Sequence, residues 1–306
     1  MNFDIHVLGT SAGQPTRDRT VSGILIARGG DRILIDPGEG TQHQLLAHDL
    51  GLATSTVCLT HMHADHTLGL AGLLQTWQFQ GREQPLTVVV PAAGTDTLAA
   101  LQTVVGGALP FATEVKPVTA QSVAVNGDDY TLRALPATHP GPAVGYGLFE
   151  DARQGRFQRD VAERLGVPPG PAFGRLQRGD TVTLSDDTIV TPEQVMGPPR
   201  RGRRFIYTGD TRPVLDATMV PTPVDLLVHE ATFLGRQQER ATRTGHSTAA
   251  EAGRVAAALD AETLVLTHLS PRYESTDGFV SEATAATDAT IKIATDGLQQ
   301  SIPYLD

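Results

Sequence analysis

The sequence of 306 residues is poor in cysteine and lysine and has no long apolar run. Its single cysteine, Cys58, lies in an apolar, β-prone stretch and has no second cysteine to pair with, which fits a reducing cytoplasm. The chain does not open with basic residues followed by apolar ones, so we expect neither secretion nor a membrane span. Lys116 and Lys292 are the only lysines, and almost every positive charge is therefore an arginine.

Net charge and length limit the classes of function and the number of domains. A formal charge of −10 argues against a field of the whole protein that attracts nucleic acid, although a local basic segment on an acidic body would still bind it. A chain of this length can bury a sizeable core as one large domain or two. We expect one domain over 1–306, because candidate site residues recur in both halves of the chain.

Residues 60–66, with the sequence THMHADH, hold the densest group of candidate metal ligands. They follow an apolar, β-prone run and precede leucines at helical spacing, so the histidines lie at a strand-to-helix turn. His61 and His63 are two apart on extended chain and point the same way. Asp65 and His66 begin the turn and can diverge toward a second ion. Imidazole and carboxylate together suit Zn or Mn, and one ion has no use for so many ligands.

Strands that end in a polar, ligand-type residue recur along the chain. These residues are Asp36, His61, His139, Asp210, Glu230 and His268. Such placement in both halves of the chain is what two packed sheets with one shared edge site would produce. The sequence therefore predicts an α/β fold with two sheets. It leaves two roles open for Asp36, a turn residue or a partner that orients a metal ligand through a hydrogen bond.

Apolar patterning predicts the main strands and helices. We expect strands at 3–8, 24–27, 33–36, 86–90, 203–208, 225–230 and 264–267, and helices at 41–48 and 95–104. The second and third strands flank a Gly-Gly-Asp turn and read as a hairpin. Thr248 and Glu251 have capping-box spacing, so a further helix is expected to open at His246.

Residues 150–202 differ in composition from the rest of the chain. Arginines are interleaved here with proline and glycine: Arg153, Arg156, Arg159, Arg164, Arg175 and Arg178. Connections this long are usually functional or disordered. Two interpretations stay open, a neutral solvated insertion and an arm that carries arginines to phosphates. Pro169, Gly170 and Pro171 would fix a tight bend at the tip of such an arm.

Motifs spread over nearly the whole chain, in order, resemble the metallo-β-lactamase superfamily. HMHADH, His139, the Asp210 of GDT and His268 carry this broad resemblance. A narrower resemblance, to the ribonuclease Z family of tRNA 3′-processing endonucleases, rests on LGTSAGQPTRDRT near the start, DPGEGTQHQ at 36–44, PPGP at 168–171, TGDTR at 208–212, HEATF at 229–233, GHST at 245–248 and LTHLSPRY at 266–273. The chain departs from the pattern at Thr20, where bacterial members more often have Asn.

The resemblance implies a four-layer αββα sandwich with a protruding arm at 150–202 and two zinc ions per chain. His61, His63 and His139 would hold one ion, Asp65, His66 and His268 the other, and Asp210 would bridge them. Paired metals provide a hydroxide at neutral pH and positive charge for phosphate oxygens. Asp65 would accept the proton of the attacking water. His246, held by Glu230, would protonate the leaving 3′ oxygen.

The function implied by this resemblance is that of a cytoplasmic, zinc-dependent endoribonuclease. It would cut the 3′ trailer from precursor tRNA and leave a tRNA 3′-OH and a trailer 5′-phosphate. The resemblance also implies a homodimer, in which the arm of one subunit grips the tRNA that the other cuts. Expected substrate contacts are Arg17, Arg19, Pro169, Gly170 and Pro171.

Two other functions stay open on the sequence. One is a small-molecule metallohydrolase, a phosphodiesterase or thioesterase, on the same fold. The other is a non-catalytic RNA-binding protein that retains metal for stability. The arm argues against the first, and the intact Asp65 argues against the second.

Overall fold

The structure, a computed structural model, describes residues 1–106 and 108–304 and divides into two compact units. The first unit, here called the body, comprises Met1–Phe149 and Arg203–Pro303. The second, here called the arm, comprises Glu150–Gly202 together with Tyr304. The arm thus has the bounds at which the composition changes. Within the described parts of the chain, no helix is both long enough and apolar enough to cross a membrane.

The body is built on two large sheets. The first contains β1 (Phe3–Gly9), β2 (Gly23–Arg28), β3 (Asp31–Ile35), β4 (Thr56–Cys58), β5 (Leu86–Pro91), β6 (Thr113–Val118) and β16 (Gln299–Ser301), in the order β16-β1-β2-β3-β4-β5-β6. The second contains β7 (Val123–Asn126), β8 (Tyr130–Pro136), β9 (Val144–Glu150), β12 (Arg204–Tyr207), β13 (Val224–Glu230), β14 (Ala261–Thr267) and β15 (Thr290–Ile293), in the order β15-β14-β13-β12-β9-β8-β7.

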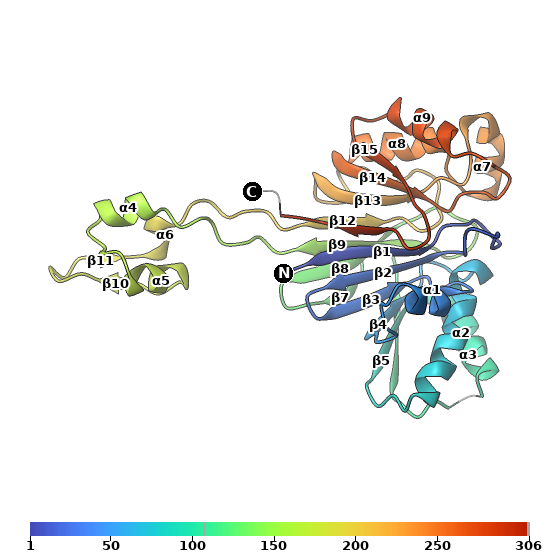
Figure 1. The fold of residues 1–306 in the computed structure, drawn as a ribbon, viewed down its shortest axis with the longest axis horizontal. Coiled ribbons are helices and arrows are strands. Elements are labelled where there is room, and N and C mark those ends of the chain that lie inside the picture. The colour runs from blue at the N-terminus through green and yellow to red at the C-terminus, as the bar shows by residue number, and fades with distance from the viewer. Residues whose placement is uncertain (107, 305–306) are drawn as a thin grey trace. The chain divides into compact units, whose positions relative to one another are not determined.

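Helices cover the outer face of each sheet (Figure 1). Beside the first sheet are α1 (Thr41–Ala47), α2 (Ala64–Phe79), the short 3₁₀ turn η1 (Ala92–Gly94) and α3 (Thr95–Val104). Beside the second are the 3₁₀ turn η2 (Gly235–Gln237), α7 (Gln238–Thr244), α8 (Ala249–Ala258) and α9 (Asp277–Thr284). Each helical layer shares a buried apolar cluster with its own sheet. The four-layer αββα sandwich expected from the sequence is therefore confirmed.

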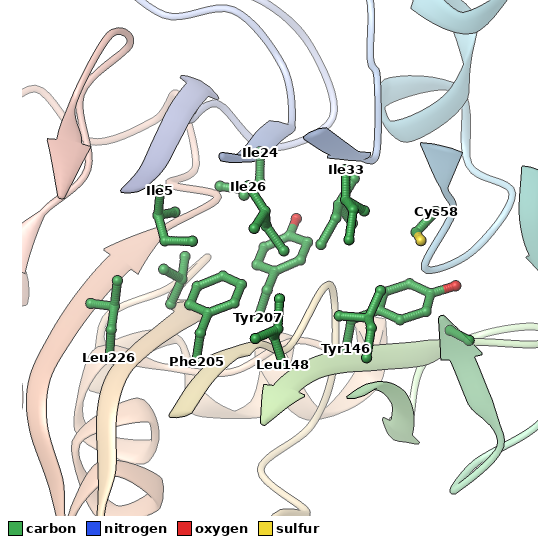
Figure 2. Packing of buried hydrophobic residues seen from close by; sticks show 14 of the residues in the cluster. Ile5, Ile24, Ile26, Ile33, Cys58, Tyr146, Leu148, Phe205, Tyr207 and Leu226 are labelled. Atoms are coloured by element: carbon green, nitrogen blue, oxygen red, sulfur yellow. The ribbon is translucent and has the colours of Figure 1, made fainter. Parts of the chain in front are cut away.

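A third apolar cluster fills the space between the two sheets (Figure 2). Strand β2 shows how the sequence produces both layers, because successive side chains of a strand point to opposite faces. Ile24 and Ile26 pack between the sheets, whereas Leu25 packs in the cluster shared with the helices. Both faces of β2 are covered, which explains its continuous apolar run. Phe205 and Tyr146 face these isoleucines from the second sheet.

Strand direction explains why the candidate site residues gather at one edge. In the second sheet, β12, β13 and β14 are parallel, so the residues that follow them emerge at the same edge. Asp210 and His268 follow β12 and β14 there, and Glu230 is the last residue of β13. In the first sheet β3 is parallel to β4, which brings Asp36 beside the residues that follow β4.

The predicted elements are present, with bounds that shift by a few residues, and the hairpin of β2 and β3 is antiparallel as expected. One shift affects the site: α2 begins at Ala64, so Asp65 and His66 lie in its first turn rather than in a turn before it. Glycines allow this helix to start so close to its neighbour. A Cβ on Gly69 would lie 2.0 Å from the carbonyl oxygen of Gly38, so α2 could not approach the loop after β3 with any larger residue there.

The arm folds around a small core of its own. It contains α4 (Arg159–Arg164), α5 (Pro171–Gln177), β10 (Val182–Thr183), β11 (Ile189–Val190) and α6 (Pro192–Val195). The buried side chains of this core are Ala162, Val167, Leu176, Val182, Val190 and Val195. Pro171 opens α5, a position where its missing N–H and fixed φ suit a helix. The segment is therefore ordered by packing, although its elements are too short to give a periodic pattern.

Candidate metal centre and active-site cleft

The structure brings all seven expected metal ligands together. Together with His246, they form three groups of ligand atoms, and within each group every atom lies within 4.8 Å of the others. The groups are His61, His63, His139 and Asp210; Asp65, His66 and His268; and Asp210, His246 and His268. The first two groups match the division that the resemblance implies. Asp210 and His268 connect the groups.

Three imidazole nitrogens converge in the first group. His63 Nδ1 lies 3.0 Å from His61 Nε2 and 3.2 Å from His139 Nε2. The other nitrogen of His139, Nδ1, lies 2.9 Å from the carbonyl oxygen of Gly245. Because a carbonyl oxygen only accepts, Nδ1 carries the proton and the lone pair on Nε2 faces the group. Asp210 Oδ2 lies 3.8 Å from His61 Nε2 and 4.0 Å from His139 Nε2.

In the second group, the buried carboxylate of Asp36 orients His66 toward two other carboxylates, those of Asp65 and Asp210. His66 Nδ1 lies 2.9 Å from Asp36 Oδ2, so the ring presents Nε2 to the group. That nitrogen is 3.4 Å from Asp210 Oδ2 and 3.6 Å from Asp65 Oδ2. Asp36 also accepts the N–H and the hydroxyl of Thr60, at 2.7 and 2.6 Å. Of the two roles left open for Asp36, the structure therefore contains the hydrogen bond that orients a ligand.

The backbone just before Asp210 allows its carboxylate to reach both groups. Gly209 has φ +58°, and a Cβ there would lie 2.8 Å from side-chain atoms of Thr60. Only glycine fits this position without strain. Within the part of the chain that the structure describes, Asp210 Oδ1 is buried and has no hydrogen-bond partner. An unsatisfied buried oxygen of this kind is suited to a metal ion.

The electrostatics of the cluster also favour a cation. Burial lowers the pKa of His66, but the carboxylates of Asp210 and Asp36 outweigh it and raise that pKa well above its ordinary value. Burial raises the pKa of Asp210, yet the neighbouring histidines His268 and His66 hold it well below its usual range. The buried carboxylates of Asp36 and Asp210 thus stabilise positive charge among the candidate ligands. Nitrogen and oxygen donors in this number fit a divalent metal.

His246 and Glu230 form a hydrogen-bonded pair beside the ligands. His246 Nδ1 lies 2.9 Å from Glu230 Oε1. Glu230 is buried and also accepts the N–H of Thr211 at 3.0 Å and the hydroxyl of Thr232 at 2.7 Å. Burial lowers the pKa of His246, but the charge of Glu230 and the hydrogen bond to it raise the pKa to about 9. The pair therefore has the geometry of an imidazolium held by a fixed carboxylate.

An arginine that the sequence analysis did not single out supports this pair. The guanidinium of Arg212 donates to the carbonyl oxygen of His246 and to both oxygens of Glu251. Glu251 in turn closes the capping box of α8 with Thr248, as expected. Arg212 lies within the TGDTR motif, which was its only signal in the sequence. Its guanidinium ties the segment that carries Asp210 to the segment that carries His246.

The expected substrate contacts lie outside the ligand groups. Arg17 is exposed. The Arg19 guanidinium donates to the Thr10 hydroxyl and to the Ala294 carbonyl oxygen, both at 2.7 Å, so it ties its loop to the rest of the body. Thr20 donates its N–H to Asp296 at 2.5 Å and its hydroxyl to the same carboxylate at 2.8 Å. Exposed residues of the arm complete the set: Pro169, Gly170 and Pro171.

The ligand groups open into a cleft of ≈ 460 Å³ within the body. Asp65, Asp210 and His246 line its floor together with His63 and His268. One wall comes from residues 12–14, whose Gly13 N–H donates to Asp65 Oδ2 at 2.8 Å. Phe233, Arg240 and Arg272 also line the cleft. The candidate ligand atoms therefore lie in a cleft whose volume is in the range of small-molecule sites.

Comparisons with known proteins agree with this geometry. A family model described as the metallo-beta-lactamase superfamily matches residues 16–156, and one described as a beta-lactamase superfamily domain matches residues 190–269. The chain is 45% identical over 307 residues to Ribonuclease Z of Natronomonas pharaonis, with 100% of each chain covered. It is 42% identical to Ribonuclease Z of Myxococcus xanthus, covering 98% of this chain and 97% of that one. The crystal structure of the short form of human tRNase Z has a TM-score of 0.69 at 25% identity, over 98% of this chain and 99% of that one.

Proposed function

The chain belongs to the ribonuclease Z family of the metallo-β-lactamase superfamily, and from this premise we propose that it is an endoribonuclease that removes the 3′ trailer from precursor tRNA. The observation that carries the proposal is the extent of the similarity. Relatives named Ribonuclease Z match the whole chain, which includes both the cleft of the body and the arm. The expected products are a tRNA ending in a 3′-OH and a trailer with a 5′-phosphate.

We assign two zinc ions to the cluster. His61, His63 and His139 would hold the first, Asp65, His66 and His268 the second, and Asp210 would contact both. The orphaned oxygen of Asp210 and the inward lone pairs of the histidines support this assignment. When bound, the ions would activate water for attack and offset the charge of the phosphate.

We assign to Asp65 the proton of the attacking water. Its Oδ2 accepts the Gly13 N–H at 2.8 Å and lies 3.4 Å from His268 Nε2. Burial raises the pKa of Asp65, but the hydrogen bond to His268 and the nearby His66 lower it below its ordinary value. The carboxylate is therefore ionised at neutral pH and can accept a proton at Oδ2.

We assign to His246 the proton that the leaving group requires. As the water oxygen bonds to phosphorus, the bond from phosphorus to the ribose 3′ oxygen breaks, and that oxygen would be a poor leaving group as an alkoxide. Because Nδ1 is engaged by Glu230, Nε2 is the nitrogen that can donate to the 3′ oxygen. The buried Glu230 holds the ring in this orientation and stabilises its positive charge.

We propose that the arm binds tRNA and takes no part in bond cleavage. All of the assigned ligands and both members of the acid pair belong to the body. The arm instead carries exposed arginines, among them Arg159, Arg164 and Arg178. Arginine is suited to phosphate through its planar set of donors. A homodimer that shares the arm between subunits, and a cytoplasmic location, remain predictions from the family.

Incubation of the purified protein with a 3′-extended tRNA tests the proposal directly. Both ends of the products are mapped, and a nitrophenyl phosphodiester is assayed in parallel. We expect one cut at the 3′ side of the tRNA, with a 3′-OH on the tRNA and a 5′-phosphate on the trailer. Turnover of the small diester without cleavage of the tRNA would favour the small-molecule metallohydrolase instead.

A further inference from the structure

Two arginines that carry no assigned role lie over one buried ring in the lining of the cleft. The guanidinium carbons of Arg240, on α7, and Arg272, four residues after His268, lie 5.9 and 5.7 Å from the centroid of the Phe233 ring. These distances are within the range of cation–π contacts. Both arginines and Phe233 line the cleft that contains the metal-ligating atoms. Two positive charges therefore lie over this ring in the lining of the cleft.

Neither positive charge has an ion-pair partner in the part of the chain that the structure describes. Both side chains are exposed, and within residues 1–106 and 108–304 neither guanidinium has a carboxylate partner. Arg212 differs, because Glu251 neutralises it. The chain has a formal charge of −10, so a pair of arginines without ion-pair partners in the lining of the cleft is a local region of opposite charge. Such a pair attracts an anionic group even though the field of the whole protein does not.

The position of the pair relative to His246 indicates which phosphate it would contact. The ring of Phe233 packs edge-on to that of His246, with centroids 6.1 Å apart. In the function proposed above, His246 protonates the 3′ oxygen that leaves, and that oxygen belongs to the nucleotide upstream of the cut. The arginines lie over the Phe233 ring, so the phosphate that they would contact is one near the nucleotide that carries this 3′ oxygen.

We propose that Arg240 and Arg272 form a clamp for the phosphate immediately 5′ of the scissile one, the last phosphodiester of the tRNA body. The proposal rests on the function proposed above. Phe233 is 4% exposed and is fixed by backbone hydrogen bonds to Ser247 and Ala249, so its ring is a rigid support. Guanidinium groups held on a rigid ring lose less conformational freedom when they bind phosphate. The clamp would position the RNA for cleavage and would not touch the reacting atoms.

Binding of the cleavage product separates the clamp from the chemistry. A tRNA that ends at the cleavage site with a 3′-OH keeps the phosphate in question and cannot be cut. We expect the double variant Arg240→Gln/Arg272→Gln to bind this RNA roughly tenfold more weakly than wild type. The slope of log K against log salt should become shallower by about 0.7 to 0.9, the contribution of one phosphate. Metal content should be unchanged, because neither arginine belongs to the groups of candidate metal ligands.

Arg236→Gln is the matched control. Arg236 also lies over an aromatic ring, that of Tyr273 at 5.4 Å, and precedes Arg240 by one helical turn, but it does not line the cleft. We expect its substitution to leave binding of the product RNA unchanged. An equal loss in this variant would overturn the clamp in favour of a diffuse basic surface.

The assignment to one phosphate is tested on the RNA itself. A neutral methylphosphonate replaces either the last linkage of the tRNA body or the first linkage of the trailer. We expect the first replacement to weaken binding to wild type roughly tenfold and to leave the double variant unaffected. The proposal would be overturned if the double variant were insensitive to the trailer replacement and not to the tRNA replacement. It would also be overturned if the double variant bound the unmodified product as tightly as wild type does. Failure of wild type to cut precursor tRNA would overturn the proposed function, while the binding cycle would still report on the clamp.

Discussion

The body and the arm place their candidate functional residues in opposite environments. In the body, Asp210 and Glu230 are buried, Asp36 orients His66, and Glu230 orients His246. In the arm, Pro169, Gly170 and Arg178 are exposed on short elements around a small core. Bond cleavage requires atoms fixed within fractions of an ångström, and burial among hydrogen-bonded partners provides this. Binding the RNA backbone requires positive charge within reach, which an exposed arginine provides.

Because chemistry depends on the buried residues of the body, we expect the largest loss of activity from substitution of Asp210, the ligand assigned to both ions. Asp210→Ala should remove a ligand of both ions, so metal content should fall from two zinc per chain at both sites together. Cleavage of precursor tRNA and of a nitrophenyl phosphodiester should both drop by more than the ~10–100-fold typical of losing an orienting partner. Elemental analysis and the two assays measure this. Glu274→Ala, which removes an exposed carboxylate of the body, is the control. One metal per chain in fully active wild type would refute the dinuclear site.

Substitution of His246, which pairs with Glu230, should reduce the cleavage rate by an amount that depends on the leaving group. His246→Ala should slow cleavage of precursor tRNA by ~10²–10⁴-fold, because the ribose 3′ oxygen needs a proton to leave. A nitrophenyl phosphodiester should be cut nearly as before, since nitrophenolate leaves without one. His43→Ala, at an exposed histidine on α1, should change neither rate. Equal losses on both substrates with normal metal content would show that His246 is not the acid.

A smaller effect is expected from the partner that orients His66. Asp36→Asn keeps the size of the side chain but weakens its hydrogen bond to His66 and replaces an acceptor of the Thr60 bonds. Zinc affinity should fall by ~10–100-fold, measured by competition with a chelator. Activity at saturating zinc should recover on both substrates. Unchanged affinity would mean that Asp36 serves only the turn at the end of β3.

The smallest effect on chemistry is expected from the arm. A variant that lacks residues 155–190, rejoined by a short Gly/Ser linker, should bind precursor tRNA more weakly. For this variant the slope of log K against log salt should be shallower by about 0.9 for each duplex phosphate that the arm neutralises in wild type. Its turnover of a nitrophenyl phosphodiester should match wild type. Loss of that turnover would instead indicate a lid over the cleft, which is the behaviour expected of a small-molecule hydrolase.

The sequence indicated the candidate metal ligands that the structure brings together, because their pattern is local. Four ligand-type residues within 60–66 have no common structural explanation, and the strand-end pattern indicated which others would join them. Parallel strands then bring Asp210 and His268 to one edge without any further information. The start of α2 was predicted less well, since leucine spacing begins only at Leu68, whereas the helix begins at Ala64 without a side-chain capping bond from His63.

Contacts between distant segments could not be predicted. Arg212 and Glu251 are separated by 39 positions, and Thr20 and Asp296 by 276, and no periodicity links either pair. Arg19 illustrates the limit: its motif indicates RNA, whereas its guanidinium is bound to Thr10 and Ala294. The fold of the arm was also not predictable, because helices of four to seven residues are too short for a reliable period.

The separation of chemistry in the body from binding by the arm is tested most directly under single-turnover conditions. Precursor tRNA is mixed with an excess of either wild type or the variant lacking residues 155–190, at protein concentrations high enough to saturate binding. The measured rate then reports cleavage and not affinity. We predict equal rate constants at saturation, with the variant needing a higher protein concentration to reach half of that rate. A lower rate constant at saturation, in a folded variant with its full zinc content, would contradict the account.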